Sequence, residues 1–173
     1  MDFISPQECP YFLVTRAGLA VTSALKKGFA EAGIENVRPA YMGALMTLWE
    51  EDGQKVVDLA RGAGLEPSTM TGLLDRMERD GLVKREADPE DRRVLRIFLT
   101  EQAKGAWPVV MRVALSVVAE AFSGIEPERL EVVKDVLRTV LKNAHEEKCS
   151  CCDVGRLSSV FRSLKNAHEE NDK

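Results

Sequence analysis

The sequence predicts a mainly α-helical fold that carries a short two- or three-stranded β ribbon near its middle. Apolar residues recur at helical spacing over most of the 173 residues. Two short segments, residues 82–86 and 94–99, instead have the composition of strands and are separated by a charged loop. The helices before and after this ribbon are long and unusually apolar, so we expect them to pack against more than one small core.

The composition is that of an ordinary globular domain. It is 45% hydrophobic and 30% charged, with a formal net charge of −4. This charge excludes a protein covered in basic residues, but DNA binding needs only a local basic surface. Residues 61–96 contain eight Lys or Arg and eight Asp or Glu, so this segment is less acidic than the whole chain.

Targeting signals are not apparent in the sequence. No apolar run approaches the roughly 20 residues of a membrane span. The segment MDFISPQECP lacks the basic and apolar regions of a secretory signal. We therefore expect a cytoplasmic protein with no membrane partner, whose cysteines stay reduced unless they bind metal or sense oxidants.

Four helices are expected before the ribbon. The first spans about residues 10–33 and is apolar on most sides, which is typical of a helix buried against its own domain and against a second chain. The second and third span about residues 39–51 and 55–62, and the fourth runs from Pro67 to about Gly81. Short helices joined by a glycine-containing turn form the helix-turn-helix arrangement.

The fourth helix is amphipathic. Its apolar face consists of Met70, Leu73, Leu74 and Met77. Its outer face carries small hydroxyls and arginine, which suits a helix that lies in the major groove of DNA. The residues predicted to contact DNA are Ser68, Thr69, Thr71, Gly72, Asp75 and Arg76. Arg76 is suited to a two-hydrogen-bond contact with guanine, and the alternative is a solvated side chain paired with a neighbouring acid.

The loop between the two strands, Asp88–Arg93, is too polar to belong to a core. A ribbon with a charged tip that follows a helix-turn-helix is a wing, so the predicted fold is a winged helix-turn-helix. We expect Arg92 and Arg93 to contact DNA, with one or the other entering a narrow minor groove. Asp91 is expected to hold Arg93 in a fixed pose.

Two long helices are expected after the ribbon. The first begins after Thr100, which is suited to cap it, and runs to about Ser123. The second begins at Pro127. Together with the first helix of the chain, these helices would form a dimer interface.

The C-terminal segment contains an internal repeat. The heptapeptide LKNAHEE occurs at Leu141–Glu147 and again at Leu164–Glu170. We therefore divide the chain into residues 1–147 and a cysteine-containing linker with a duplicated helix at residues 148–173. Within the first part, the DNA-binding lobe spans about residues 38–100, and residues 10–33 and 100–147 form the dimerisation helices.

Taken together, these motifs resemble the MarR family of bacterial winged-helix regulators over about residues 10–147. The resemblance rests on VVDLARGAGLEPSTMTGLLDRMERDGLVKR at residues 56–85, the DPEDRR wing loop and the LT after the second strand. It implies a homodimer that represses nearby genes from a near-palindromic operator, and that releases DNA when a small, often aromatic, ligand or an oxidant acts on it. Glu66 departs from the Ser or Thr that usually precedes the reading helix.

The resemblance also implies a small-molecule pocket, in the crevice between the dimer helices and the DNA-binding lobe. The candidate lining residues are Tyr11, Arg16, Met46, Trp49, Trp107 and Met111. The alternative for each of them is ordinary core packing.

Three interpretations of the cysteines remain open. Cys9 lies at a helix start, where the helix dipole can lower the pKa of a thiol, and the oxidant-sensing branch of the family carries a cysteine in a similar place. A metal ion is the second option, with candidate ligands His145, Cys149, Cys151 and Cys152. The third option is reduced thiols in a linker. No cofactor is required by any feature of the sequence.

The favoured function is therefore sequence-specific DNA binding by a ligand- or stress-responsive regulator. The main alternative is a winged helix that binds another protein and not DNA. We do not expect an enzyme, because both histidines, His145 and His168, belong to the repeated heptapeptide and the sequence offers no nucleophile–base pair or phosphate loop.

Overall fold

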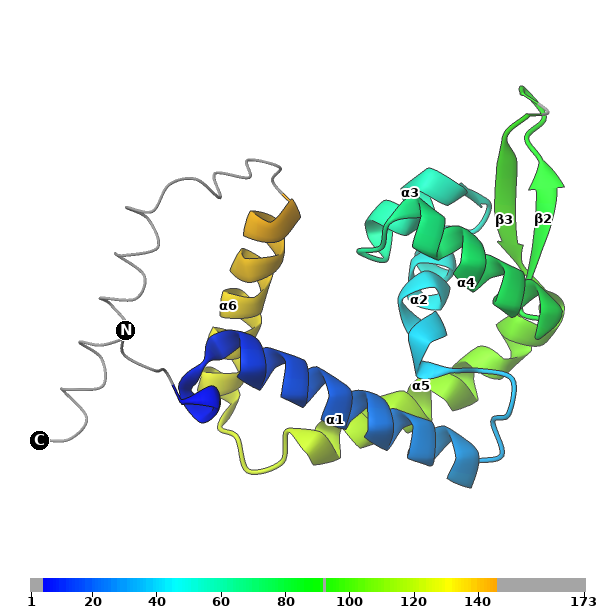
Figure 1. The fold of residues 1–173 in the computed structure, drawn as a ribbon. Helices are drawn as coiled ribbons and strands as arrows, with labels where there is room; N and C mark the ends of the chain where they lie inside the picture. Colours follow the sequence, from blue (N-terminus) through cyan, green and yellow to red (C-terminus); the bar gives the residue numbers. More distant parts are fainter. Residues whose placement is uncertain (1–4, 92, 146–173) are drawn as a thin grey trace, which may run out of the picture. The chain divides into compact units, whose positions relative to one another are not determined.

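The computed structural model describes residues 5–91 and 93–145, and it confirms the predicted winged helix-turn-helix fold (Figure 1). In chain order the elements are η1 (Pro6–Glu8), α1 (Pro10–Glu31), η2 (Pro39–Tyr41), α2 (Met42–Glu50), β1 (Gln54–Lys55), α3 (Val56–Gly62), α4 (Pro67–Arg79), β2 (Val83–Ala87), β3 (Leu95–Leu99), α5 (Glu101–Ala121) and α6 (Pro127–His145). The chain divides into two compact units, one up to Ser123 and one from Gly124.

The wing is the larger part of a three-stranded antiparallel sheet with strand order β1-β3-β2. Strands β2 and β3 pair along their whole length, from Val83 opposite Leu99 to Ala87 opposite Leu95. Strand β1 has only two residues, and Gln54 lies opposite Ile97. This third strand joins the wing to the turn between α2 and α3.

The core of the first unit lies beneath the recognition helix α4. The apolar face predicted for this helix is buried, with Met70, Leu73, Leu74 and Met77 at most 3% exposed. These side chains belong to one cluster with buried residues of α2, α3 and the sheet, among them Leu48, Leu59 and Ile97. Burial of these side chains stabilises the unit by about 25 cal/mol for each Å² of apolar area removed from water.

Helix α1 lies side by side with α5 (Figure 1). The two helices approach closely at Gly28, because a Cβ atom there would lie 2.7 Å from Cγ2 of Val117. Within α1 only Phe29 is buried, whereas Tyr11 and Leu19 are 79% and 63% exposed. A large part of the apolar surface of α1 is therefore uncovered in the single chain.

Thr100 caps α5, as the sequence predicts. Its Oγ1 accepts a hydrogen bond from the backbone N–H of Ala103 at 3.1 Å and donates one to the backbone oxygen of Gly81 at 2.7 Å. The cap therefore fixes the start of α5 and ties it to the turn that follows α4.

The second unit is described through α6. Its apolar side chains Val133, Leu137, Val140 and Leu141 are between 37% and 59% exposed. Such a face is typical of a helix that packs against a partner. Among the described helices, none is long and apolar enough to cross a membrane. The second LKNAHEE copy and the predicted boundary at residue 147 lie outside the described residues, so both stay predictions.

Candidate nucleic-acid interface

The outer face of α4 is open to solvent at the predicted contact positions. Ser68, Thr69 and Thr71 are exposed, and Gly72 is half-buried. Thr71 donates its hydroxyl hydrogen to the backbone oxygen of Pro67 at 2.9 Å, so it has no hydrogen left to donate to a base. This face can therefore offer hydroxyl groups of Ser68 and Thr69, and a methyl group and an acceptor oxygen of Thr71.

Arg76 and Asp75 differ in their partners. Arg76 is exposed, and its guanidinium forms no ion pair or hydrogen bond with the described part of the chain. Arg76 is therefore a solvated side chain without an acidic partner in the described residues, and its contact with DNA stays a prediction. Asp75 accepts a hydrogen bond from Nη2 of Arg85 on β2 at 2.6 Å, so its carboxylate is directed to the wing. A direct DNA contact of Asp75 stays a prediction, and it would compete with this ion pair.

At the wing tip, Asp91 holds Arg93 in the manner expected from the sequence. Asp91 Oδ1 accepts hydrogen bonds from the backbone N–H of Arg93 at 3.0 Å and from Nε at 3.1 Å. The Arg93 side chain hydrogen bond, followed by the backbone one, lowers the pKa of the Asp91 carboxyl. The Arg93 side chain is nevertheless 91% exposed. Arg92, the other predicted wing arginine, lies outside the described residues.

Asp88 is buried, although no described residue of the wing loop belongs to the apolar core. It is 2% exposed, and its carboxylate accepts hydrogen bonds from the backbone N–H of Glu90 at 2.8 Å and from Nε of Arg96 at 2.7 Å. Arg96 also donates from Nη1 to the backbone oxygen of Gly53 at 3.1 Å. Asp88 thus closes the loop and links it to the base of the sheet. The sequence signal for this role is an Asp followed by Pro, which is typical of a side chain that caps a turn.

Replacing Asp88 by asparagine is expected to lower the thermal unfolding midpoint. The backbone N–H of Glu90 and the Arg96 guanidinium hold the pKa of the Asp88 carboxyl below its ordinary value of 3.8. A carboxyl whose pKa falls on folding stabilises the protein above its unfolded pKa, and this contribution is lost as the pH falls through the folded pKa. The difference in midpoint between wild type and Asp88→Asn should be full near neutral pH and shrink as the pH falls below 3.8 and through the folded pKa. Circular dichroism melts across this range measure it, and a difference that does not change with pH would contradict the assignment.

The C-terminal end of α4 is anchored to η2. Tyr41 is 1% exposed. Its hydroxyl donates a hydrogen bond to Oδ2 of Asp80 at 2.7 Å, and Nε of Arg38 lies 3.4 Å from the same oxygen. Burial, followed by the hydrogen bond to Asp80, raises the pKa of the Tyr41 hydroxyl. The sequence did not predict this cluster, because Tyr41 and Asp80 are 39 residues apart and no local pattern joins them.

The structure brings together two of the six predicted ligand-pocket residues. The rings of Trp49 and Trp107 contact each other, with centroids 3.3 Å apart and planes at 39°. Nε1 of Trp49 is buried and has no hydrogen-bond partner among the described residues. Met111 is half-buried, and Arg16 lies over the ring of Phe12.

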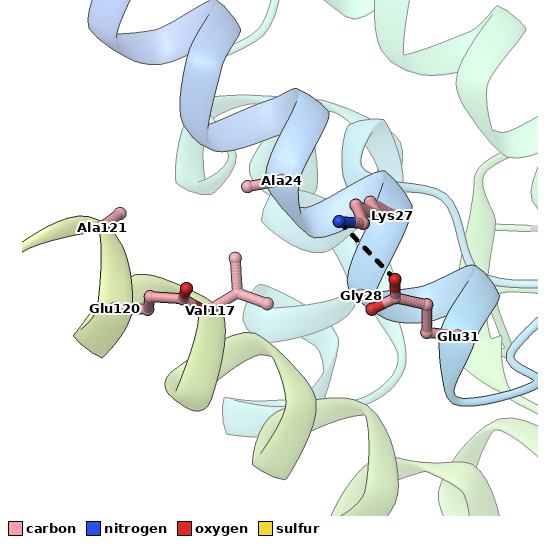
Figure 2. Close-up of a pocket in the computed structure, with 7 residues that line it drawn as sticks. All are labelled: Ala24, Lys27, Gly28, Glu31, Val117, Glu120 and Ala121. Carbon is pink, nitrogen blue, oxygen red and sulfur yellow. Dashed lines mark ion pairs between the residues drawn. The ribbon is translucent and has the colours of Figure 1, made fainter.

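A different opening lies between α1 and α5 (Figure 2). It is a shallow cleft, and Lys27 and Glu31 form an ion pair of 3.7 Å at its side. Its lining residues are Ala24, Lys27, Gly28, Glu31, Val117, Glu120 and Ala121. None of them is a predicted ligand contact. Tyr11 and Met46 are exposed, at 79% and 48%. A pocket lined by all six predicted residues therefore stays a prediction.

Cys9 is a free, half-buried thiol at the N-cap of α1. Its side chain makes no cap hydrogen bond, and a role in redox sensing stays a prediction. In the described part of the chain, no three His, Cys, Asp or Glu side chains are grouped to hold a metal ion. Cys149, Cys151, Cys152 and the side chain of His145 lie outside that part, so the metal hypothesis is not addressed.

Comparisons with known proteins agree with the winged helix-turn-helix geometry. A sequence model of the MarR family matches residues 40–95, which contain the helix-turn-helix and most of the wing. The uncharacterized HTH-type transcriptional regulator YfiV of Bacillus subtilis is 35% identical over 109 residues, covering 61% of this chain and 68% of YfiV. The chain belongs to the MarR family. This MarR-family protein is therefore a winged-helix transcriptional regulator.

Solved structures extend the likeness of this MarR-family protein to most of its length. CouR from Rhodococcus jostii RHA1, bound to p-coumaroyl-CoA, is 27% identical with a TM-score of 0.67, covering 80% of this chain and 96% of CouR. Reduced AbfR bound to DNA is 26% identical with a TM-score of 0.62, covering 78% of this chain and 91% of AbfR.

Proposed function

We propose that this MarR-family protein is a cytoplasmic repressor that binds a near-palindromic operator as a homodimer. Helix α4 of each protomer enters a major groove, and the wing tip reaches the adjacent minor groove. The observation that carries this proposal is Arg93, which is 91% exposed at the tip of the ribbon and yet held in one pose by Asp91. A fixed, exposed arginine is suited to a narrow and negative groove.

The dimer accounts for apolar surface that the single chain leaves open. Leu19 on α1 is 63% exposed, and Val132 and Leu141 on α6 are 63% and 59% exposed. Surfaces of this kind on long helices are typical of obligate contacts between copies of a chain. A twofold dimer would present two α4 helices about 34–36 Å apart, which is one turn of DNA.

The test is to select DNA with the purified protein from fragments of its own genome and sequence the fragments. The account predicts a shared near-palindrome whose affinity falls steeply with salt, since phosphate contacts release counterions. Recovery of unrelated fragments with equal affinity would instead favour the alternative function, a winged helix that binds another protein. In that case an apolar patch is expected to replace the basic wing tip as the contact surface.

A small molecule is proposed to release the operator by binding near Trp49 and Trp107. The buried, unpartnered Nε1 of Trp49 is the observation that favours this site, because a buried donor without a partner costs about 1–3 kcal/mol and a ligand acceptor would satisfy it. The likeness to CouR makes aromatic acids and their CoA thioesters the first class to examine. The ligand must bind the DNA-free conformation better than the DNA-bound one.

A panel of aromatic acids and their CoA thioesters, including p-coumaroyl-CoA, provides the measurement. The chain has two tryptophans, Trp49 and Trp107, so tryptophan fluorescence, excited where its two tyrosines do not absorb, reports on this site alone. We expect a compound that releases the operator to change the emission, and Trp49→Phe, which keeps a ring but removes the N–H, to weaken that compound's binding about tenfold. A compound that releases the operator without changing the emission would place the effector elsewhere.

A further inference from the structure

Arg85 on strand β2 connects the wing directly to the recognition helix. Its Nη2 donates to Oδ1 of Asp75 at 2.6 Å, and its Nη1 donates to Oε2 of Glu78 at 2.8 Å. Both acids belong to α4, and they lie three residues apart on one helical face. Figure 1 shows α4 reaching the base of the β2–β3 ribbon. One guanidinium therefore spans the two elements predicted to touch DNA.

The position of Arg85 in the strand separates it from its charged neighbours. Side chains alternate along a strand, so Lys84 and Glu86 lie on the opposite face of the ribbon, where they form their own ion pair of 2.7 Å. The Arg85 side chain is 22% exposed, whereas those of Lys84 and Glu86 are 57% and 49% exposed. The Arg85 guanidinium is thus hydrogen-bonded to two carboxylates and mostly covered, unlike that of an arginine that is free to bind phosphate.

Polar contacts add to the buried apolar face in fixing the orientation of helix α4. Glu66 occupies the N-cap without making a side-chain hydrogen bond, so the N-terminal end of the helix is not capped by a side chain. The C-terminal end is held by the Tyr41–Asp80 hydrogen bond. Between these two ends of the helix, the planar guanidinium of Arg85 provides two charge-assisted hydrogen bonds. They fix both the distance and the direction between β2 and α4. Asp75 and Glu78 would otherwise present two uncompensated carboxylates beside the groove-facing surface.

We propose that Arg85 is a positioning residue for DNA recognition, which locks α4 and the wing into one pose through Asp75 and Glu78. This inference rests on the proposed function, because it concerns the same DNA interface. It assigns Asp75 to support of the recognition helix, in place of a base contact. Sequence specificity depends on this pose, since base contacts need both α4 and the wing in register, whereas phosphate contacts tolerate a change in angle.

The experiment measures the affinity of the full chain for its selected operator and for a scrambled duplex of equal length, at several salt concentrations. For Arg85→Gln we expect the ratio of the two dissociation constants to fall about tenfold, with an unchanged salt slope. Arg85→Lys should recover part of this loss, because a lysine can contact one acid at a time. The matched control is Lys84→Gln, which removes the same charge from the same strand and should leave the ratio within about twofold.

The double variant Asp75→Asn/Glu78→Gln breaks the same bridge from the other side. It should lower the specificity ratio similarly, and the triple variant with Arg85→Gln should be no worse than either, because all three remove one coupled unit. If Arg85→Gln fails to fold, as judged by circular dichroism, this double variant carries the test.

Three results would overturn the proposal. The first is a specificity ratio that does not change in Arg85→Gln or in the double variant. The second is equal weakening on both duplexes with a salt slope smaller by about 0.9, which marks a direct phosphate contact. The third is additive losses in the triple variant. If the wild-type chain does not prefer any selected sequence over the scrambled duplex, the proposed function itself fails, which is a separate outcome.

Discussion

Replacing Arg76 by alanine is expected to weaken operator binding by about 1–3 kcal/mol, or about 5- to 150-fold. Arg76 is exposed on α4, and its guanidinium is not held by any acid in the described residues. A free planar fork in the major groove is suited to the O6 and N7 atoms of guanine. Fluorescence anisotropy with the selected operator measures the loss.

The loss at Arg76 should be confined to one base pair. Operators altered at the contacted base pair should bind Arg76→Ala about as well as the original operator does. Arg79→Ala is the matched comparison, because Arg79 is exposed on the same helix but lies outside the predicted reading positions. It should lower the affinity for all sequences alike, if at all. An Arg76→Ala protein that discriminates base pairs as well as wild type would contradict the assignment of Arg76 to base reading.

Replacing Gly53 by alanine is expected to destabilise the protein by about 2–5 kcal/mol, because two costs add. Gly53 has φ +75°, a conformation that costs a residue with a Cβ about 1–2 kcal/mol. The new Cβ would also lie 2.6 Å from Cε1 of Phe98 on β3, and overpacking of this kind costs about 1–3 kcal/mol. Chemical denaturation at equilibrium measures the free energy of unfolding.

Gly33→Ala separates these two costs. Gly33 has φ +71°, but a Cβ there would have no heavy atom within 4 Å. It should lose only the conformational part, about 1–2 kcal/mol. If the two variants lose the same free energy of unfolding, the Phe98 contact plays no part. The larger loss of stability in Gly53→Ala should be accompanied by weaker operator binding, because the backbone oxygen of Gly53 accepts a hydrogen bond from Arg96 on β3.

Local patterns were sufficient to predict most of the fold. The apolar spacing of Met70, Leu73 and Met77 predicts the buried face of α4, and all three are at most 3% exposed. Thr100 at the start of a long apolar helix predicts the cap that the structure has. The DPEDRR segment predicts a wing loop. Each of these features depends on residues close together in the chain, where helical period, capping and turn chemistry are directly readable.

Contacts between distant parts of the chain were not predictable. Nothing in the sequence indicates that Asp75 is paired with Arg85. An Asp followed by Pro predicts a turn at Asp88, but not that this residue is covered while Arg93, five residues later, is 91% exposed. Both results depend on contacts of the ribbon with α4 and with the turn at Gly53. The two-residue strand β1 is also too short to show an alternating pattern. The predicted ligand pocket has the same limit, since the rings of Trp49 and Trp107 contact each other but Tyr11 and Met46 are exposed.

The most direct test of the account is a hydroxyl-radical footprint of the protein on its selected operator. The account predicts two protected regions whose centres lie one helical turn, about 10–10.5 base pairs, apart and related by twofold symmetry, with minor-groove protection on their flanks. In Arg93→Ala, the flanking minor-groove protection should disappear while the two central regions remain at higher protein concentration. A single protected region without symmetry, or flanking protection that persists in Arg93→Ala, would contradict a dimer that reads DNA with α4 and the wing.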